Sequence, residues 1–285
     1  MNISHRFEDA SNDVFFILFT RENPTNGERI NFDSESIRNS HWNPLNDVRI
    51  LIHGFWASYL SRENIVTTAE FLRKKDYNII AVDWSVLAAG EADVVIANIP
   101  RVGVVVGQFI DFLYSHGFTQ YYKINIIGHS FGSHVAGFAG KNTNYGKINA
   151  IFATDPSHRV GTFEDPSSRL DLTDANYVEA IITSTIGFRR PISHATFYPN
   201  FGLTQPGCNH DSGCDHHRAT EFYTESINSN GFVSRKCNNF EEIDNQNCQG
   251  TGVFEILGGD NAKIINGNYS VFYLETNAES PFARG

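Results

Sequence analysis

The feature that most constrains this chain is a Gly-x-Ser-x-Gly pentapeptide between a predicted strand and a predicted helix. The pentapeptide runs from Gly128 to Gly132 and directly follows residues 123–127, which have the apolar pattern of a buried strand. Residues 133–139 have the pattern of a helix. The two glycines let the chain turn sharply around Ser130, where a side chain would collide with the strand or the helix. This setting predicts a nucleophilic serine at the carboxyl edge of a sheet.

Strand and helix patterns alternate along the first two-thirds of the chain. We expect strands at residues 48–53, 78–84, 122–127, 148–154 and 177–183, and helices at residues 62–75, 92–116 and 130–141. Pro100 is expected to kink or break the second of these helices. Buried strands that alternate with helices indicate a doubly wound, mostly parallel α/β sheet. The tail adds a possible last strand at residues 269–275 and is too short for a second domain, so we expect one domain over residues 1–285.

The charge balance argues against a nucleic-acid binder. The chain has 32 acidic residues and 22 Lys and Arg, which gives a net charge of −10, and the basic residues form no cluster. No apolar run reaches about 18 residues, so we expect no membrane span. The N-terminal residues lack a signal-peptide pattern, which fits either a cytosolic protein or a mature form whose leader was removed.

The cysteines help to choose between these compartments. Cys208, Cys214, Cys237 and Cys248 form an even, clustered set outside the apolar body of the chain. Such a set predicts two disulfides and an oxidising compartment. A zinc site is the alternative, because two cysteines, three histidines and two aspartates fall within residues 208–217.

An acyl-transfer site also needs backbone N–H groups that stabilise an oxyanion. The residue after the nucleophile, Phe131, is one expected donor. The apolar strand at residues 50–52 runs into His53-Gly54-Phe55, and we expect the Phe55 N–H to be the second donor.

The acid and the base of a serine hydrolase follow the serine in the order Asp or Glu, then His. Asp155 ends the predicted strand at residues 148–154, so its carboxylate can reach a histidine beside Ser130. Three later aspartates lie in polar loop sequence and are expected to be solvated: Asp165, Asp171 and Asp174. The candidate bases are His158, His194, His210, His216 and His217, and spacing alone does not separate them.

Several stretches spread over nearly the whole chain resemble the pancreatic lipase family, and more closely its insect and vespid phospholipase A1-like branch. They are residues 20–24, 52–55, 82–85, 127–134, 197–200, 205–208, 214–219 and 275–282. The resemblance implies an α/β-hydrolase fold, secretion and a triad of Ser130, Asp155 and His216. His216 lies two residues after Cys214, where the family's Cys-x-His-x-Arg motif has its base.

The resemblance also implies the remaining parts of the site. The oxyanion donors would be Phe55 and Phe131, and the disulfides would be Cys208–Cys214 and Cys237–Cys248. We expect no cofactor and no metal ion. The family's C-terminal β-sandwich domain is not found in this sequence, so no colipase partner is expected.

The chain departs from the family pattern near the predicted acid and at two later positions. Thr154 precedes Asp155 where an apolar residue is usual, and His158-Arg159 replaces small residues or proline. Ile182 and Thr196 stand where the family usually has His and Asp. None of these changes removes a member of the implied triad.

The substrate prediction rests on a short loop. Only five residues, 209–213, separate Cys208 from Cys214, where lipases of the family carry a long lid. Five polar residues are too few for an amphipathic helix of useful length. In this family short lids accompany phospholipase A1 activity, so we expect release of the sn-1 fatty acid from phospholipids at a membrane or micelle surface. Arg189 and Arg190 are the candidate contacts to the head group.

Two other functions remain open. The first is hydrolysis of triacylglycerols or galactolipids. The second is a non-catalytic lipid carrier like insect yolk proteins, which lack the serine that is present here as Ser130.

Overall fold

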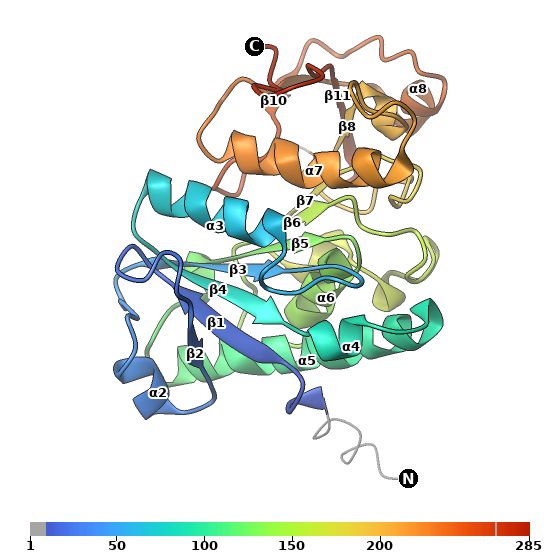
Figure 1. The fold of residues 1–285 in the computed structure, drawn as a ribbon. Coiled ribbons are helices and arrows are strands. Elements are labelled where there is room, and N and C mark those ends of the chain that lie inside the picture. The colour runs from blue at the N-terminus through green and yellow to red at the C-terminus, as the bar shows by residue number, and fades with distance from the viewer. Residues whose placement is uncertain (1–9, 266) are drawn as a thin grey trace.

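A mostly parallel sheet of eleven strands runs through the part of the chain that the computed structural model describes, residues 10–265 and 267–285 (Figure 1). The strands are β1 (Phe15–Phe19), β2 (Glu28–Ile30), β3 (Asp47–Ile52), β4 (Tyr77–Asp83), β5 (Ile124–His129), β6 (Ala150–Thr154), β7 (Tyr177–Ile181), β8 (Ala195–Pro199), β9 (Val233–Lys236), β10 (Phe254–Ile256) and β11 (Ser270–Leu274). The helices are α2 (Ser34–Arg38), α3 (Arg62–Lys74), α4 (Ser85–Ala88), α5 (Ala92–Ser115), α6 (Phe131–Lys141), α7 (Ser212–Ser226) and α8 (Phe240–Asp244). Short 3₁₀ helices are η1 (Tyr121–Lys123), η2 (Pro166–Ser168), η3 (Leu172–Asp174) and η4 (Asn200–Gly202).

The strand order places the ends of β3 and β5 side by side. The order is β10-β9-β11-β8-β7-β6-β5-β3-β4-β1-β2, and the pairs from β4 through β8 to β11 are parallel. From β3 the chain moves outward to β4 and then returns to the other side of β3 as β5, with Ile52 opposite Gly128. Such a switch point opens a crevice at the carboxyl ends of the strands. The predicted α/β-hydrolase fold is therefore confirmed.

Helices cover both faces of the sheet. Figure 1 shows α5 and α6 on one face and α3 and α7 on the other, and each pair encloses its own apolar core. Among the described residues, α5 is the one helix whose length and composition would allow a membrane span, and half of that window is buried in this fold. Pro100 lies within α5 and does not end it.

The expected strands and helices are present with ends shifted by a few residues, and β11 matches the expected last strand. Periodicity does not predict β1, β8 or α7. The clearest local signal for α7 is Asp211, whose side chain accepts hydrogen bonds from the N–H groups of Gly213 and Cys214 and so caps the helix. Asp211 lies between Cys208 and Cys214, in a cysteine-rich stretch that is typical of loops, so the sequence does not predict a helix there.

Backbone contacts around the turn after β5 leave no room for side chains. A β-carbon on Gly132 would lie 2.2 Å from the Ile52 carbonyl oxygen, and one on Gly128 would lie 2.4 Å from the Gly132 oxygen. Both glycines are therefore required by the close approach of α6 to β3 and β5.

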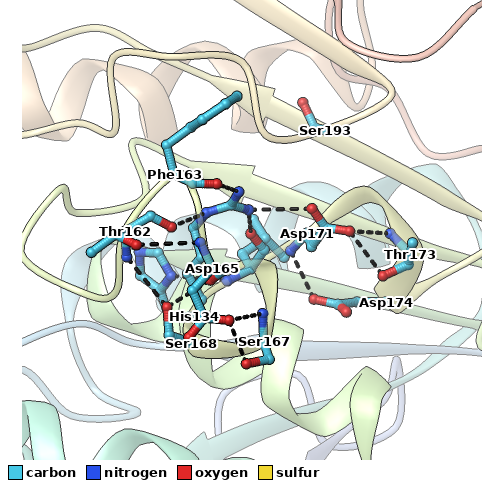
Figure 2. A network of polar contacts seen from close by, with 12 residues as sticks. His134, Thr162, Phe163, Asp165, Ser167, Ser168, Asp171, Thr173, Asp174 and Ser193 are labelled. Carbon is cyan, nitrogen blue, oxygen red and sulfur yellow. Dashed lines mark hydrogen bonds and ion pairs between the residues drawn. The ribbon is translucent and has the colours of Figure 1, made fainter.

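A buried network anchors the segment after β6 to α6. The guanidinium of Arg169 is 1% exposed and donates to the carbonyl oxygens of Thr162, Phe163 and Leu170 at 2.7–2.8 Å. His134 of α6 donates from Nε2 to the Ser157 carbonyl oxygen and accepts at Nδ1 from the Leu170 N–H. Burial lowers the pKa of His134 to about 3, so the ring stays neutral while it makes these bonds. Figure 2 shows His134, Thr162 and Phe163 close together in this network.

Asp171 and Asp174 belong to the same network, which corrects the expectation that they are solvated. Each is 2% exposed, whereas Asp165 is exposed as expected. Asp174 accepts from the Asp171 N–H and from Lys141 Nζ, which lies at the end of α6 (Figure 2 labels both aspartates). Burial outweighs the attraction of Lys141 and raises the pKa of Asp174 to about 6.

We predict that Gly132→Ala destabilises the protein, because the new β-carbon would meet two carbonyl oxygens of the β3 end, those of Ile52 and His53. The free energy of unfolding should fall by about 3 kcal/mol or more, as measured by urea denaturation. Gly146→Ala is the matched control, since its β-carbon would come no closer than 3.5 Å to Tyr121. Equal stability of the two variants would contradict this packing.

The Asp174 carboxyl predicts a pH-dependent stability. Because folding raises its pKa, the native state holds this proton more tightly than the unfolded chain, so the stabilisation is complete below pH ~4 and is lost as the pH rises through about 6. The stability of the wild type relative to Asp174→Asn should fall by up to about 3 kcal/mol over this range. Urea denaturation at a series of pH values measures the difference. A difference that stays constant or grows with pH would show that the carboxyl is ionised more easily than its burial implies.

Candidate active site

Ser130 occupies a strained turn between β5 and α6. Its φ angle is 56°, in the left-handed region that non-glycine residues rarely adopt. The Ser130 N–H donates to the Thr154 carbonyl oxygen at 3.0 Å, and Gly54 approaches so closely that a β-carbon there would lie 3.0 Å from Ser130 Cβ. The side chain therefore stands at the carboxyl edge of the sheet, where the sequence predicts it.

Asp155 and His216 are in direct contact. Asp155 directly follows β6 and is fully buried, whereas His216 lies in the first turns of α7. His216 Nδ1 donates to Asp155 Oδ2 at 2.6 Å. This bond orients the ring and leaves its Nε2 as the nitrogen able to exchange a proton with another group.

The segment after β7 holds the Asp155 carboxylate in place. The backbone N–H groups of Thr183 and Ser184 donate to Oδ1 at 2.8 and 3.3 Å, and the Ser184 hydroxyl donates to Oδ2. Gly187 also approaches Oδ1 so closely that a β-carbon there would lie 2.4 Å away. Sequence reasoning does not identify Ser184, and its one signal is its place just beyond the next parallel strand.

Ser130 and His216 line the same cavity, which has a volume of about 390 Å³. The lining residues are His53, Gly54, Phe55, Ala57, Ser61, Glu63, Asn64, His129, Ser130, Phe131, Ser157, His158, Arg159, Ile186, His216 and His217. Within the described residues no hydrogen bond joins Ser130 Oγ to the His216 ring, and such bonds are often long in ligand-free enzymes. A larger hollow of about 810 Å³ between α3 and α7 contains neither Ser130 nor His216, so the smaller cavity is the candidate site.

Phe55 and Phe131 lie beside the serine from two different strand ends. Their rings are 5.5 Å apart, and in the described part of the chain neither backbone N–H donates to another protein group. The Phe55 loop is held by His53 and Trp84. His53 accepts from the Trp84 N–H at Nε2, and the Trp84 indole donates to the His53 carbonyl oxygen.

Three histidine rings that line the cavity lie close to one another. The ring of His129 lies 4.5 Å from that of His216 and 5.1 Å from that of His217. Burial lowers the pKa of His129 well below its usual range, so this ring is neutral. His217 hydrogen-bonds to Glu63 at 2.9 Å, and this contact raises the pKa of His217 and lowers that of Glu63. Both pKa shifts favour the charged forms, so His217 of α7 and Glu63 of α3 form an ion pair at the edge of the cavity.

Two of the other histidines named as candidate bases lie away from the cavity. His194 bonds to the backbone of Val178, and His210 is exposed on the loop before α7. His158 and His217 do line the cavity, but it is His216 that contacts Asp155.

The two arginines expected at the head group lie elsewhere. Arg189 donates to the carbonyl oxygens of Phe201 and Gly202 and pairs with Asp244. Arg190 pairs with Glu164. Neither is among the residues that line the cavity, so their expected place beside it is corrected. Arg189 is drawn toward η4 and α8 by these contacts, whereas Arg190 lies over the Phe163 ring in the segment after β6.

The cysteines form the two disulfides that the family resemblance implies, Cys208–Cys214 and Cys237–Cys248. The thiols are thus bonded to each other, which removes the zinc site as an explanation of the cysteine and histidine cluster. Of the five residues between Cys208 and Cys214, 209–211 form a tight turn, with Asn209 and His210 at positive φ, and the last two already belong to α7.

Comparisons with known proteins agree on one family. A family model described as Lipase matches residues 2–282. Pancreatic triacylglycerol lipases of Mus musculus and Cavia porcellus are 31% and 30% identical over 94% and 98% of this chain. Lipase member H of Danio rerio is 29% identical over 100% of it. The chain spans 64% to 66% of the length of these relatives.

Solved structures of hydrolases are also similar. An esterase of Pyrococcus furiosus is 18% identical, with 62% of this chain and 70% of that chain covered and a TM-score of 0.32. A phospholipase/carboxylesterase of Dyadobacter fermentans is 13% identical, with 62% and 75% covered and a TM-score of 0.35. The family model covers nearly the whole chain, and this protein therefore belongs to the lipase family.

Proposed function

We propose that this protein hydrolyses lipid esters through a triad of Ser130, Asp155 and His216. The observation that carries the proposal is the 2.6 Å hydrogen bond from His216 Nδ1 to buried Asp155, beside a cavity that His216 shares with Ser130. Membership of the lipase family supports the same reaction class.

In the first half of the reaction, Ser130 Oγ attacks the carbonyl carbon of an ester while His216 takes the hydroxyl proton at Nε2. Asp155 holds the ring in the required tautomer and stabilises its positive charge. The tetrahedral intermediate places a negative charge on the former carbonyl oxygen, and the N–H groups of Phe55 and Phe131 are the proposed donors to it. His216 then gives its proton to the departing alcohol oxygen, and the acyl group stays on Ser130.

In the second half, water replaces the alcohol. His216 takes a proton from the water as its oxygen attacks the acyl carbon, and the same oxyanion donors act again. The proton returns to Ser130 Oγ, and the fatty acid leaves. This sequence restores the free enzyme without a cofactor.

The favoured substrate is a phospholipid, with release of the sn-1 fatty acid. The support is the Cys208–Cys214 turn, because residues 209–211 lead directly into α7 at Ser212 and so form no separate helix able to cover the cavity. Triacylglycerol is the second candidate, and the names of the mammalian relatives favour it. Galactolipid hydrolysis and a non-catalytic carrier role are the other candidates, and a comparison of substrates tests them together with the first two. The two disulfides support a place of action outside the cell.

We predict that the purified protein hydrolyses phosphatidylcholine faster than triolein or a galactolipid when all three are presented in mixed micelles. The released fatty acid and the remaining lysolipid should show cleavage at the sn-1 position. Mass spectrometry of the products measures both the rate and the position.

Ser130→Ala is the control for this substrate panel, and it should lower every rate by roughly 10⁵- to 10⁶-fold while circular dichroism stays unchanged. Faster turnover of triolein would replace the phospholipase proposal with a triacylglycerol lipase. Equal turnover by Ser130→Ala would refute the triad, and lipid binding without any hydrolysis would favour the carrier.

A further inference from the structure

The wall of the candidate cavity carries one arginine, although the chain as a whole is acidic. Arg159 lies four residues after Asp155 and lines the cavity with His158. The carboxylate that also lines this cavity, Glu63, is bridged to His217 at 2.9 Å, so its charge is already compensated. The net charge of the whole chain is −10, so this local cation is a feature of the site rather than of the general surface.

The turn that presents Arg159 is held rigidly. Ser157 forms an isolated bridge with Gly187, and both the N–H and Nδ1 of His158 lie 2.9–3.0 Å from the Ile186 carbonyl oxygen. Buried His134 of α6 donates to the Ser157 carbonyl oxygen. The Cα of Arg159 is therefore fixed relative to Asp155, which reduces the entropy lost when its side chain binds a ligand.

The guanidinium of Arg159 is available to a ligand. Its side chain is 50% exposed, and its ion pair with Asp93 spans 3.3 Å to a carboxylate that is 93% exposed. Exposed pairs of this kind contribute little, because both partners remain solvated. A phosphodiester offers two charged oxygens that match the guanidinium fork, which gives a stronger and more directional contact.

The remaining cavity lining is suited to an acyl chain. Phe55, Ala57, Phe131 and Ile186 contribute apolar surface next to Ser130. A molecule that fits both this apolar lining and the Arg159 guanidinium has an aliphatic chain, an ester and an anionic group close to one another.

We propose that Arg159 is the residue that recognises the phosphate of a phospholipid substrate. The inference rests on the proposed ester hydrolysis and deepens it by assigning the head-group contact to Arg159 in place of Arg189 and Arg190. Those two arginines are directed to backbone carbonyls and to acids outside the cavity. The guanidinium binds the phosphodiester oxygens while the ester carbonyl lies beside Ser130.

The test compares Arg159→Gln with Arg284→Gln on soluble short-chain substrates. Arg284 is a matched control, since its side chain is 52% exposed and makes an ion pair with Glu275 away from the cavity. The substrates are monomeric dihexanoylphosphatidylcholine and a neutral ester, p-nitrophenyl butyrate. For Arg159→Gln, the ratio of kcat/KM for the phospholipid to kcat/KM for the neutral ester should fall by about 10- to 100-fold. Arg159→Lys should recover only part of this ratio, because an ammonium cannot make the forked contact.

A binding measurement separates this inference from the proposed function. Ser130→Ala protein should bind a non-hydrolysable dihexyl ether analogue of the phospholipid about 10-fold or more tightly than the Ser130→Ala, Arg159→Gln double variant in isothermal titration. This difference would support the head-group contact even if the wild type hydrolysed no phospholipid, a result that would refute the phospholipase proposal alone.

Three outcomes would overturn the inference. The first is an unchanged substrate ratio and unchanged affinity for Arg159→Gln. The second is an equal change in Arg284→Gln or a larger one in Arg190→Gln. The third is binding of inorganic phosphate as tightly as the ether lipid, which would show a free-anion site in place of a lipid head-group site.

Discussion

The close approach of three parallel strand ends is the constraint on which the rest of this structure depends. The ends of β3, β5 and β6 meet where α6 begins, and the backbone there is so crowded that only glycine fits at positions 128 and 132. This crowding holds Ser130 at a φ angle of 56° and brings its side chain to the sheet edge. The cost of such strain is of order 1–3 kcal/mol and is borne by the surrounding packing. The position of Ser130, the proposed nucleophile, is thus a consequence of sheet geometry as much as of the serine itself.

The carboxylate of Asp155 connects the site to the stability of the fold. Donors from the segment after β7 fix both of its oxygens, and His216 on α7 takes the remaining position. The chain that follows Asp155 is anchored to α6 through His134 and then through the buried Arg169 network. One continuous set of polar contacts therefore supports the Asp155 carboxylate, the turn that carries Arg159 and helix α6, which begins directly after Ser130. Because these contacts are buried, loss of one partner leaves others unsatisfied.

Sequence reasoning locates the parts of the site that depend on strand ends. Ser130, Asp155 and Phe55 each follow an apolar strand, and parallel strands bring their carboxyl ends to one edge. His216 has no such signal, since it lies on α7, which periodicity does not predict, and only the family motif singles it out. Ser184 and the burial of Asp174 depend on side chains that meet across the fold, so no local pattern reveals them. Arg189 and Arg190 follow Ser184 by only a few residues, yet they pair with Asp244 and Glu164 outside the cavity. The arginine that lines the cavity is Arg159.

The claim that Ser130 is made nucleophilic by His216, and His216 by Asp155, is tested most directly by covalent labelling with a fluorophosphonate. Intact-protein mass spectrometry should find one adduct on the wild type, and peptide mapping should assign it to Ser130. His216→Ala and Asp155→Asn should slow the labelling by roughly 10³-fold or more, since the serine hydroxyl then lacks an oriented base. Labelling of Ser130 at the wild-type rate in both variants, or an adduct on another residue, would contradict the account.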